Sequence, residues 1–579
     1  MTKLVAGVLL AVSAFAQSKA QPDLCVPPPS GTAPALPAHL MTGQGTEYVH
    51  FAITTSNPEA QKFFDQGLAQ MHSFWAVESE RSFLQAAALD PEAPMPWWGV
   101  AMVASGDYRP RHQLEANRGG GDPRPNQRVL AAAQKAVELA KVPGKATDLE
   151  KLYIASIAAR RMPPAGKSAD DAYIEGLRAI IAAHPKEVEA RTFLSLHLMR
   201  GFELPDHTPR ADSMESVAIL RQLLKDAPDH PGVHHYVIHA WEGSSFASDA
   251  WPSCKRYAEL VPNIPHALHM PGHIYSQTGK FDLAEKYFGM ANVNELGYIK
   301  ADSLYGTGHH GHNTHYLSTA YAFDGQYDKA KEYARSLLEF EENPREKAAV
   351  DNAYTAHRQG WFALMRAMVL SEDWDELLDG KSLPVYDRPR EQAWRHWALA
   401  VAQAGKGNAA AAQEEAKQMD AALKDYEAQV KKQPPVELTV ARQELDGHIL
   451  AAQGKTDAAI KSLKRASDAQ RKIRYSEPPQ YPRPVNEALG EIALKAGKTH
   501  EAQIAFRTAL EDLPNSSRSV KGLAASGGRA QSHGRGRGID RGNSCPADLR
   551  EAETGAKPLS SRAKDAPLPG MRPALESRP

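Results

Sequence analysis

The sequence predicts an all-α fold, a solenoid of stacked helix pairs. Apolar residues recur at helical spacing through residues 58–516, and glycine-containing turns interrupt them at intervals. The same pattern returns in segments of about 34 residues, which is typical of repeat architectures. The period-two alternation of half-buried strands is not seen between residues 58 and 515. These observations place one helical repeat domain at residues 58–516.

Residues 1–20 are predicted to be a signal peptide. Lys3 supplies a positive start, an apolar stretch follows it, and Ala14-Phe15-Ala16 fits the small-x-small cleavage pattern. The protein is therefore predicted to be exported, to the periplasm or by secretion, with no membrane span after signal cleavage. The alternative is an uncleaved N-terminal anchor. Residues 21–57 are predicted to be an extended N-terminal segment, because most of them lie in a stretch rich in Pro, Ala and Gly.

Composition and charge exclude several classes of protein. The 579 residues include 68 Lys and Arg against 69 Asp and Glu, which gives a formal net charge of −1. This balance argues against a nucleic-acid partner, which would require a basic surplus. Three cysteines are too few for a disulfide-framed scaffold or a four-cysteine zinc site. In an oxidising compartment Cys25 and Cys254 could pair, a question that the sequence leaves open.

Four segments carry the repeat most clearly, and they cover residues 265–298, 311–344, 440–473 and 483–516. In the last of them Gly497 supplies the turn, and Ala502, Phe506, Ala509 and Pro514 follow at fixed spacing. This spacing resembles the tetratricopeptide repeat, in which small residues let two helices approach and larger residues fill the seam between repeats. The resemblance implies a right-handed α-solenoid of tetratricopeptide-like helix pairs.

Two further stretches resemble a family of exported bacterial tetratricopeptide proteins. They read LDPEAPMPWWGVAM, which begins at Leu89, and HPGVHHYVIHAWE, which begins at His230. The resemblance implies an exported repeat protein and adds no particular activity.

Two segments fall outside the repeat pattern. Residues 105–127 form a polar, glycine-rich insertion, and such a loop often lies on the working edge of a solenoid; the alternative is a disordered insertion. Residues 517–579 begin another repeat and then become rich in Gly, Arg, Pro and Ser, which predicts a broken repeat and a disordered tail. A reading frame shifted near residue 524 is one hypothesis for this ending.

Histidines are the residues that indicate a candidate binding site in this sequence. Eleven of the 23 histidines lie between residues 230 and 315. Repeats that begin at residues 231, 265 and 311 align most of them at the second, fifth and ninth positions. The tetratricopeptide resemblance implies that these positions face a concave groove. The residues predicted to line this groove and bind a ligand are His235, His239, Glu242, His266, His269, His273, His312 and His315.

Three interpretations of the histidine set stay open. The first is recognition of a peptide, protein or small ligand, and the second is a structural polar network between repeats. The third is a metal site at His239, His269 and His273, because neutral imidazole is the commonest metal ligand and histidines four residues apart can share one ion. No cofactor is expected in the first two interpretations, and Zn²⁺, Cu²⁺ or Ni²⁺ would suit the third.

Motifs of common enzymes are absent from the sequence. H-E-x-x-H and C-x-x-C do not occur, and no G-x-S-x-G stands in a strand–turn–helix setting. The sequence therefore favours an exported interaction module, without enzymatic activity, whose partner is a protein, a peptide or a small ligand. The alternatives are a periplasmic transition-metal-binding protein and a metal-dependent hydrolase, for which Glu242 is the local base candidate.

Overall fold

The computed structural model describes residues 38–103, 127–203, 207–301, 305, 307–342, 350–473, 476 and 478–528. The predicted signal peptide, nearly all of the insertion at 105–127, the tail beyond residue 528 and Cys25 lie outside these residues. Cys254 is a free, buried cysteine. The chain divides into two compact units, and every described residue belongs to the first, Met1–Gln531.

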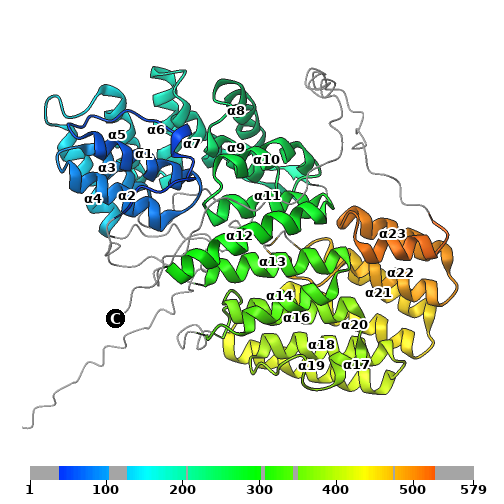
Figure 1. Ribbon diagram of the computed structural model, residues 1–579. Coiled ribbons are helices and arrows are strands. Elements are labelled where there is room, and N and C mark those ends of the chain that lie inside the picture. The colour runs from blue at the N-terminus through cyan, green and yellow to red at the C-terminus, as the bar shows by residue number, and fades with distance from the viewer. Residues whose placement is uncertain are drawn as a thin grey trace, which may run out of the picture. The chain divides into compact units, whose positions relative to one another are not determined.

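Helices pair along the described part of the chain (Figure 1). The first group comprises α1 (Pro58–His72), α2 (Ala76–Leu89), α3 (Pro94–Val103), α4 (Gln127–Ala140), α5 (Asp148–Arg161), α6 (Ala169–Ala183), α7 (Val188–Leu198) and α8 (Ser213–Asp226). The central group comprises α9 (Pro231–Trp241), α10 (Trp251–Leu260), α11 (Pro265–Gln277), α12 (Phe281–Ala301), α13 (Gly308–Asp324) and α14 (Tyr327–Leu338). The last group comprises α16 (Ala356–Ser371), α17 (Trp374–Leu378), α18 (Pro389–Gly405), α19 (Ala409–Val430), α20 (Val436–Ala452), α21 (Thr456–Gln470), α22 (Val485–Lys495), α23 (Thr499–Asp512) and α24 (Ser517–Ala525).

The remaining regular elements are short. They are two 3₁₀ helices, η1 (Thr46–Tyr48) and η3 (Ala247–Ala250), and two strands, β1 (Phe202–Glu203) and β2 (Thr208–Pro209), which pair antiparallel. The predicted all-α solenoid of helix pairs is confirmed.

The clearest pairs combine a glycine on the first helix with a large side chain on the second. A Cβ atom on Gly272 of α11 would lie 2.5 Å from the Phe288 ring of α12, and one on Gly490 of α22 would lie 2.7 Å from the Phe506 ring of α23. Gly497, in the turn between α22 and α23, has φ +75°, a conformation that favours glycine. The close approach of two helices that the repeat pattern predicts is therefore present in these pairs.

A segment at residues 38–57 connects α1 to the central helices. The Gln66 side chain of α1 donates to the main-chain carbonyl of His39 at 2.8 Å. The Gln44 side chain donates to the carbonyl of Asn263, in the turn between α10 and α11, also at 2.8 Å. The start of the described chain is thus fixed against the repeat that contains α11.

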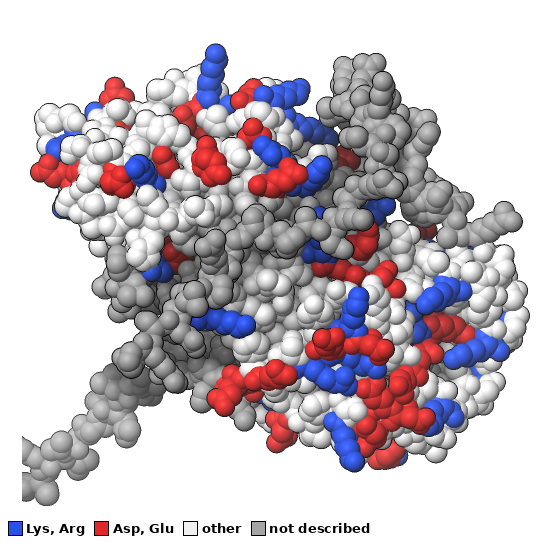
Figure 2. Space-filling model, in the orientation of Figure 1, with Lys and Arg blue, Asp and Glu red and all other residues white. Residues whose placement is uncertain are grey.

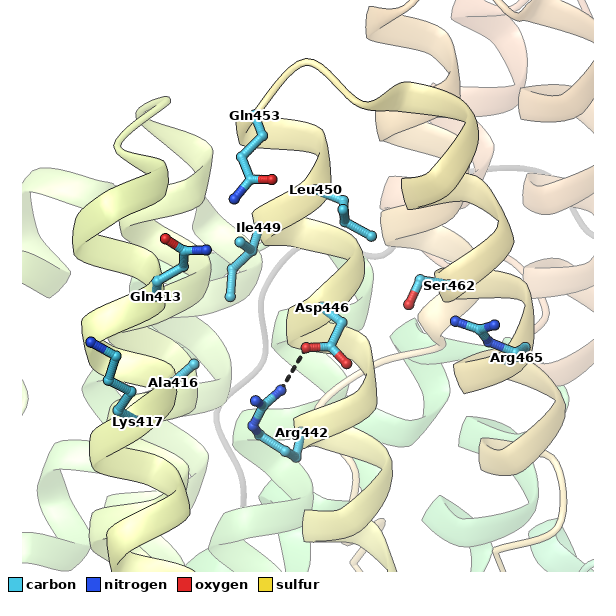
Figure 3. A pocket seen from close by; sticks show the side chains of 10 residues that line it. All are labelled: Gln413, Ala416, Lys417, Arg442, Asp446, Ile449, Leu450, Gln453, Ser462 and Arg465. Atoms are coloured by element: carbon cyan, nitrogen blue, oxygen red, sulfur yellow. Dashed lines mark hydrogen bonds and ion pairs between the residues drawn. The ribbon is translucent and has the colours of Figure 1, made fainter.

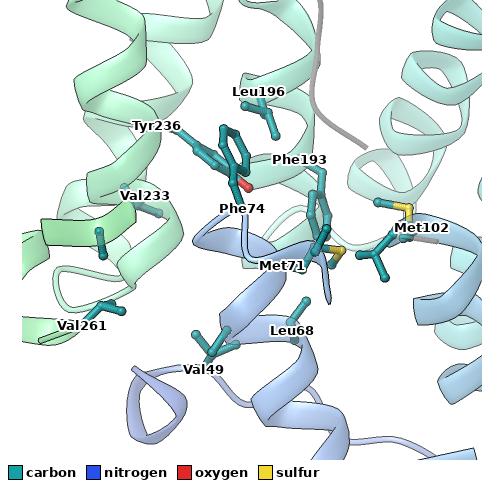
Figure 4. Packing of buried hydrophobic residues seen from close by; sticks show 14 of the residues in the cluster. Val49, Leu68, Met71, Phe74, Met102, Phe193, Leu196, Val233, Tyr236 and Val261 are labelled. Atoms are coloured by element: carbon teal, nitrogen blue, oxygen red, sulfur yellow. The ribbon is translucent and has the colours of Figure 1, made fainter. Parts of the chain in front are cut away.

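A hydrophobic core surrounds the place where α1, α7 and α9 meet. Figure 4 shows Phe74 beside Tyr236, with Phe193 and Leu196 of α7 close by. The ring centroids of Phe74 and Tyr236 are 6.0 Å apart. Phe74 stands in the turn between α1 and α2 with φ +53°, which is uncommon for a bulky residue. This turn therefore directs an aromatic ring toward α9.

Charged side chains of both signs are interspersed over the face shown in Figure 2. This distribution agrees with the balanced formal charge of the sequence. Among the described residues, no helix combines the length and the apolar character needed to cross a membrane.

Candidate metal centre

The first helices of three successive repeats, α9, α11 and α13, bring six imidazoles together. These imidazoles form two groups of three, and within each group the ligand atoms lie within 4.8 Å of one another. The α9 triad consists of His235, His239 and His266, and the α11 triad consists of His269, His273 and His312. Each triad joins two histidines four residues apart on one helix to the second-position histidine of the next repeat. The same arrangement therefore occurs in consecutive repeats.

A hydrogen bond at His269 Nδ1 and an ion-pair contact at His273 Nδ1 orient two rings of the α11 triad. His269 Nδ1 lies 2.8 Å from Asn313 Oδ1, and the Asn313 amide donates to the carbonyl of Phe288 at 3.2 Å. His273 Nδ1 lies 2.8 Å from Glu242 Oε1. Because both acceptors are oxygen atoms, they assign a proton to each Nδ1 and leave a lone pair on each Nε2. This tautomer binds a metal through Nε2.

The Nε2 atoms of the α11 triad converge. His273 Nε2 lies 2.5 Å from His269 Nε2, and His312 Nε2 lies 3.1 Å from the same atom. Two lone pairs at such distances repel unless a proton or a cation lies between them. Burial, followed by the imidazoles of His273 and His312, holds the pKa of His269 well below its usual range, which disfavours an added proton. A metal ion would satisfy the lone pairs, with nitrogen atoms about 3.3 Å apart in a tetrahedral site.

The α9 triad has the same construction. His235 Nδ1 lies 2.5 Å from the main-chain carbonyl oxygen of His72, and His239 Nδ1 lies 3.1 Å from Glu242 Oε2. His235 Nε2 lies 3.1 Å from His266 Nε2. Burial and the surrounding imidazoles hold the pKa of His266 well below its usual range, so this ring is neutral near pH 7. Glu242 is therefore hydrogen-bonded to His239 of the α9 triad and lies at ion-pair distance from His273 of the α11 triad.

The predicted site residues do not line an open groove. Their relative exposures all lie between 0% and 7%. The Phe74 ring stacks on the His239 ring at a centroid distance of 5.4 Å and meets the His235 ring edge-on at 4.4 Å. A ring from an early repeat thus covers the α9 triad, which corrects the prediction: these residues form a buried cluster instead of a groove wall.

The predicted metal set of His239, His269 and His273 is also corrected. His239 belongs to the α9 triad, whereas His269 and His273 belong to the α11 triad. Glu242 lies between the two sets, hydrogen-bonded to His239 and paired with His273. Helical spacing shows which histidines share a helix face, but it does not show which residue of the next repeat completes each site.

His315 contacts a cation that belongs to the protein itself. Its Nε2 atom accepts from Arg366 Nη1 at 2.8 Å, and its Nδ1 atom lies 3.1 Å from Gln359 Oε1. The buried Arg366 guanidinium also donates to Thr319 Oγ1, four residues after His315, and to the carbonyl of Pro479. Arg366 thus contacts the fifth and ninth positions of this repeat, which are histidines in each of the two preceding repeats. His315 is therefore not a member of either triad.

A third group, formed by His72, Glu189 and His230, is a structural network. Glu189 accepts from His72 Nε2 at 2.7 Å and from His230 Nε2 at 2.9 Å. His72 Nδ1 lies 3.0 Å from the Tyr236 hydroxyl, and His230 Nδ1 accepts from the main-chain N–H of Val233. All four ring nitrogens thus have hydrogen-bond partners. This pairing of nitrogen with oxygen or N–H contrasts with the nitrogen-to-nitrogen contacts of the two triads.

His309 is a site residue that the repeat alignment misses. Its ring centroid lies 5.8 Å from that of His266 and 5.5 Å from that of His269. His309 Nδ1 lies 2.7 Å from Glu295 Oε1. The aligned second, fifth and ninth positions exclude this residue, although its place three residues before His312 puts both on one face of α13. The spacing of the histidines gives no indication that Phe74 contacts the site.

Comparisons with known proteins agree with the repeat architecture. Residues 265–289, which include α11, match the tetratricopeptide repeat family. No curated protein matches the chain at a significant level. With the helix pairs described above, the matched repeat defines a tetratricopeptide-like helical repeat protein.

Several solved helical proteins are similar to the chain. The Cut9–Hcn1 hetero-tetramer of the APC/C has 13% identity, with 81% of this chain and 76% of that chain covered and a TM-score of 0.28. The P58(IPK) TPR domain has 13% identity, with 81% and 97% covered and a TM-score of 0.21. The human IFIT1 dimer with m7Gppp-AAAA has 12% identity, with 83% and 92% covered and a TM-score of 0.31.

Proposed function

We propose that this helical repeat protein binds transition-metal ions at the α9 and α11 triads. One observation carries the proposal: ring nitrogen atoms converge in each triad, while the Nδ1 atoms of four of the six rings lie within 3.1 Å of oxygen atoms. Such outer acceptors fix the tautomer and the orientation of metal-ligating histidines. A purely structural network would pair ring nitrogens with other polar partners, as the His72, Glu189 and His230 group does.

The donor set indicates the class of metal. Imidazole suits Zn²⁺, Cu²⁺ and Ni²⁺, whereas Mg²⁺ and Ca²⁺ prefer oxygen ligands. Three protein ligands per ion would leave a fourth position for water or another small ligand. Both carboxylate oxygens of Glu242 face histidine Nδ1 atoms, so we assign Glu242 to ring positioning and not to the base of a hydrolase.

Metal analysis of the full-length protein, purified without nickel resin, tests this proposal. We expect bound Zn, Cu or Ni, and a marked loss of metal in the double variant His269→Ala/His273→Ala. His234→Ala is the matched control, because His234 is also buried in α9 but bonds to Ser253 Oγ and to the carbonyl of Pro228. Absence of bound metal, together with no uptake from added salts, would overturn the proposal.

We further propose that the protein acts after export, on the basis of the predicted signal peptide. The residues that precede the two candidate cleavage points are Ala16 and Ala20. Mass spectrometry of the exported protein should therefore find a new N-terminus at residue 17 or 21. A chain that still begins at Met1 would contradict the proposal.

Binding of a protein or peptide partner is a second candidate function, favoured by a separate cavity. This cavity of about 540 Å³ lies among α19, α20 and α21 (Figure 3), and its lining includes Lys417, Arg442, Asp446 and Arg465. Lys417 pairs with Glu414 and Arg442 pairs with Asp420 and Asp446, so Arg465 is the cation of this lining that is placed to bind a carboxylate of an acidic peptide. We expect the double variant Lys417→Glu/Arg465→Glu to lose binding of an acidic peptide, as measured by cross-linking of the peptide to the protein. The metal content should stay the same. Unchanged peptide binding would count against this surface.

A further inference from the structure

We infer that the two triads form a single dinuclear metal centre and that His309 is its seventh histidine. The inference rests on the proposed metal-binding function and deepens it. Three features carry it: the two triads are neighbours, one carboxylate serves both, and one further imidazole lies between them.

The two triads share a helix and lie side by side. α11 contributes His266 to the α9 triad and His269 to the α11 triad, and these residues are three positions apart on one helix face. Their ring centroids are 6.3 Å apart. Because each imidazole nitrogen would hold its ion at about 2.0–2.1 Å, ions bound by the two triads would lie beside adjacent rings of one helix.

Glu242 links the two triads in their outer coordination shell. Its Oε2 atom lies 3.1 Å from His239 Nδ1, and its Oε1 atom lies 2.8 Å from His273 Nδ1. The carboxylate is 2% exposed. A shift of either ring on metal binding therefore moves the hydrogen-bond acceptor of a ring in the other triad. Loading of one triad is expected to alter the affinity of the other.

His309 is placed to bind a metal through Nε2. Its Nδ1 atom lies 2.7 Å from Glu295 Oε1, which assigns the proton to Nδ1. Its Nε2 atom is buried and has no hydrogen-bond partner within the described part of the chain. The His309 ring lies 5.8 Å from that of His266 in the α9 triad and 5.5 Å from that of His269 in the α11 triad, centroid to centroid. The geometry therefore supplies one additional imidazole that either ion, or both in turn, can use.

Two buried carboxylates provide the negative charge that such a centre needs. Seven neutral imidazoles carry no charge, so two divalent ions would bring four positive charges into a buried site. Glu242 and Glu295, 2% and 6% exposed, each contact a ring nitrogen of the cluster and offset part of this charge. The remaining positive charge would favour a small anion, such as hydroxide, as an additional ligand.

Titration of the metal-free, full-length protein with Zn²⁺, followed by electron paramagnetic resonance after loading with Cu²⁺, tests the inference. We expect two equivalents of Zn²⁺ per chain and, at full copper loading, a spectrum broadened or suppressed by coupling between two Cu²⁺ ions. His309→Asn should weaken binding of one equivalent by about 10-fold or more. Glu242→Gln should weaken both equivalents. His310→Asn is the control, because the adjacent His310 ring is 2% exposed, packs against Phe340 and lies 3.9 Å from Glu295 Oε2, beyond hydrogen-bond distance.

The outcomes separate this inference from the proposed function. No bound Zn²⁺ or Cu²⁺ would overturn both. One equivalent, or two equivalents of Cu²⁺ with the spectrum of isolated ions, would overturn the dinuclear centre and leave the metal-binding function standing. Wild-type affinity in His309→Asn and in a second variant, His309→Gln, would remove His309 from the centre. Equal thermal unfolding of the metal-free variants and the wild type would show that these effects do not come from misfolding.

Discussion

A single amide decides which nitrogen of His269 is available for a metal. Asn313 Nδ2 donates to the carbonyl of Phe288, and this bond turns Oδ1 toward His269 Nδ1. The histidine must then carry its proton on Nδ1, and Nε2 faces the other two rings of the α11 triad. Asn313 comes from the same helix as His312, so α13 supplies both a ligand and the residue that orients another ligand.

Replacement of Asn313 tests this assignment. Asn313→Leu removes the acceptor, and we expect the metal affinity of the α11 triad to fall by about 10–100-fold. Asn313→Asp keeps an oxygen at the same place and should retain most of the affinity. Competition with a chromophoric chelator measures both. Wild-type affinity in the leucine variant would show that the tautomer is set in another way.

Arg366 makes a testable contribution to stability. Its guanidinium donates to the His315 ring, the Thr319 hydroxyl and the carbonyl of Pro479. Arg366→Met fills a similar volume but leaves buried acceptors without donors, so we expect a loss of about 1–3 kcal/mol in the free energy of unfolding. Chemical denaturation measures this change, and the metal content should stay constant. A more stable variant would show that burial of the guanidinium outweighs its hydrogen bonds.

Glu444 of α20 makes a pH-dependent contribution to the free energy of unfolding. Burial alone would raise the pKa of Glu444, but the Arg483 guanidinium, with His448 and Tyr481, lowers it to about 2 from a usual value of 4.5. Since the folded pKa is depressed, the stabilisation is present above about pH 4.5 and is lost as pH falls toward 2. We expect about 3 kcal/mol of the stability at pH 7 to depend on this ionisation.

Denaturation of Glu444→Gln between pH 7 and pH 2.5 measures the contribution. The variant should be less stable than the wild type at pH 7, and the difference should shrink as the solution is acidified. A difference that does not vary with pH would mean that the carboxylate is stabilised equally in the unfolded chain. Glu427→Gln, at an exposed position of α19, is the control.

At the scale of elements, α11 shows how repeat packing sets the site. Gly272 lies between His269 and His273, and a Cβ atom there would come within 2.5 Å of the Phe288 ring of α12. The ring of His269 also packs on Phe288, with centroids 4.9 Å apart. The glycine that closes the helix pair is therefore the same residue that lets two ligands keep their positions.

Gly272→Ala should separate α11 from α12. We expect a loss of about 1–3 kcal/mol in unfolding free energy, because the added methyl group overpacks the seam, together with weaker metal binding by the α11 triad. Gly289→Ala in α12 is the control, since nothing lies within 4 Å of a Cβ atom there; it should be neutral or stabilising by about 0.5–1 kcal/mol. Equal behaviour of the two variants would contradict the packing argument.

Local patterns in the sequence were sufficient to predict the helices and their pairing. Gly490, Gly497 and Phe506 occupy places that the repeat spacing assigns to a close contact and a turn. The start of another repeat after residue 516 corresponds to α24, Ser517–Ala525. These features depend on residues within about one repeat of each other, which is why periodicity finds them.

The site was predicted only in part, because its remaining determinants are not local. The alignment of repeats grouped six of the histidines that form the triads, and it identified Glu242 beside them. It did not predict burial, since Phe74 reaches the cluster from more than 150 positions earlier in the chain. It also included His315, because the spacing of the histidines cannot reveal that His315 Nε2 accepts a hydrogen bond from the Arg366 guanidinium.

At the scale of the whole molecule, contacts between distant repeats supplement the contacts between neighbours. The Gln44 side chain bonds to the carbonyl of Asn263, and Tyr305 donates to Glu78 at 2.7 Å. Near the other end of the described chain, the Asn515 side chain donates to the carbonyl of Gly279 at 3.1 Å. In an ideal solenoid each repeat contacts only its neighbours. Here the repeat that contains α11 is held by segments far away on both sides of it in sequence.

Replacement of Phe74 tests how much a contact between distant repeats stabilises the region around α9. Phe74→Ala removes the ring that covers the α9 triad, and we expect a loss of about 3–5 kcal/mol in unfolding free energy. Metal should also pass to an external chelator faster, because water and chelator reach the imidazoles more easily. Stopped-flow measurement of metal release checks this, with Phe74→Leu as a variant that keeps an apolar cover. Unchanged release from the alanine variant would show that the cover does not control access.

Under the proposed metal-binding function, the guanidinium of Arg366 would end the series of histidine triads. Each of the two preceding repeats contributes two imidazoles to a triad, and the repeat that follows supplies the third. At His315 and Thr319 the series ends, because a permanent positive charge already occupies the next place. Duplication of the repeat that contains α11 would therefore lengthen the series by one ion without any change at its end. Under the proposed function, the number of bound ions would follow the number of histidine-bearing repeats, and Arg366 would mark the end of that series.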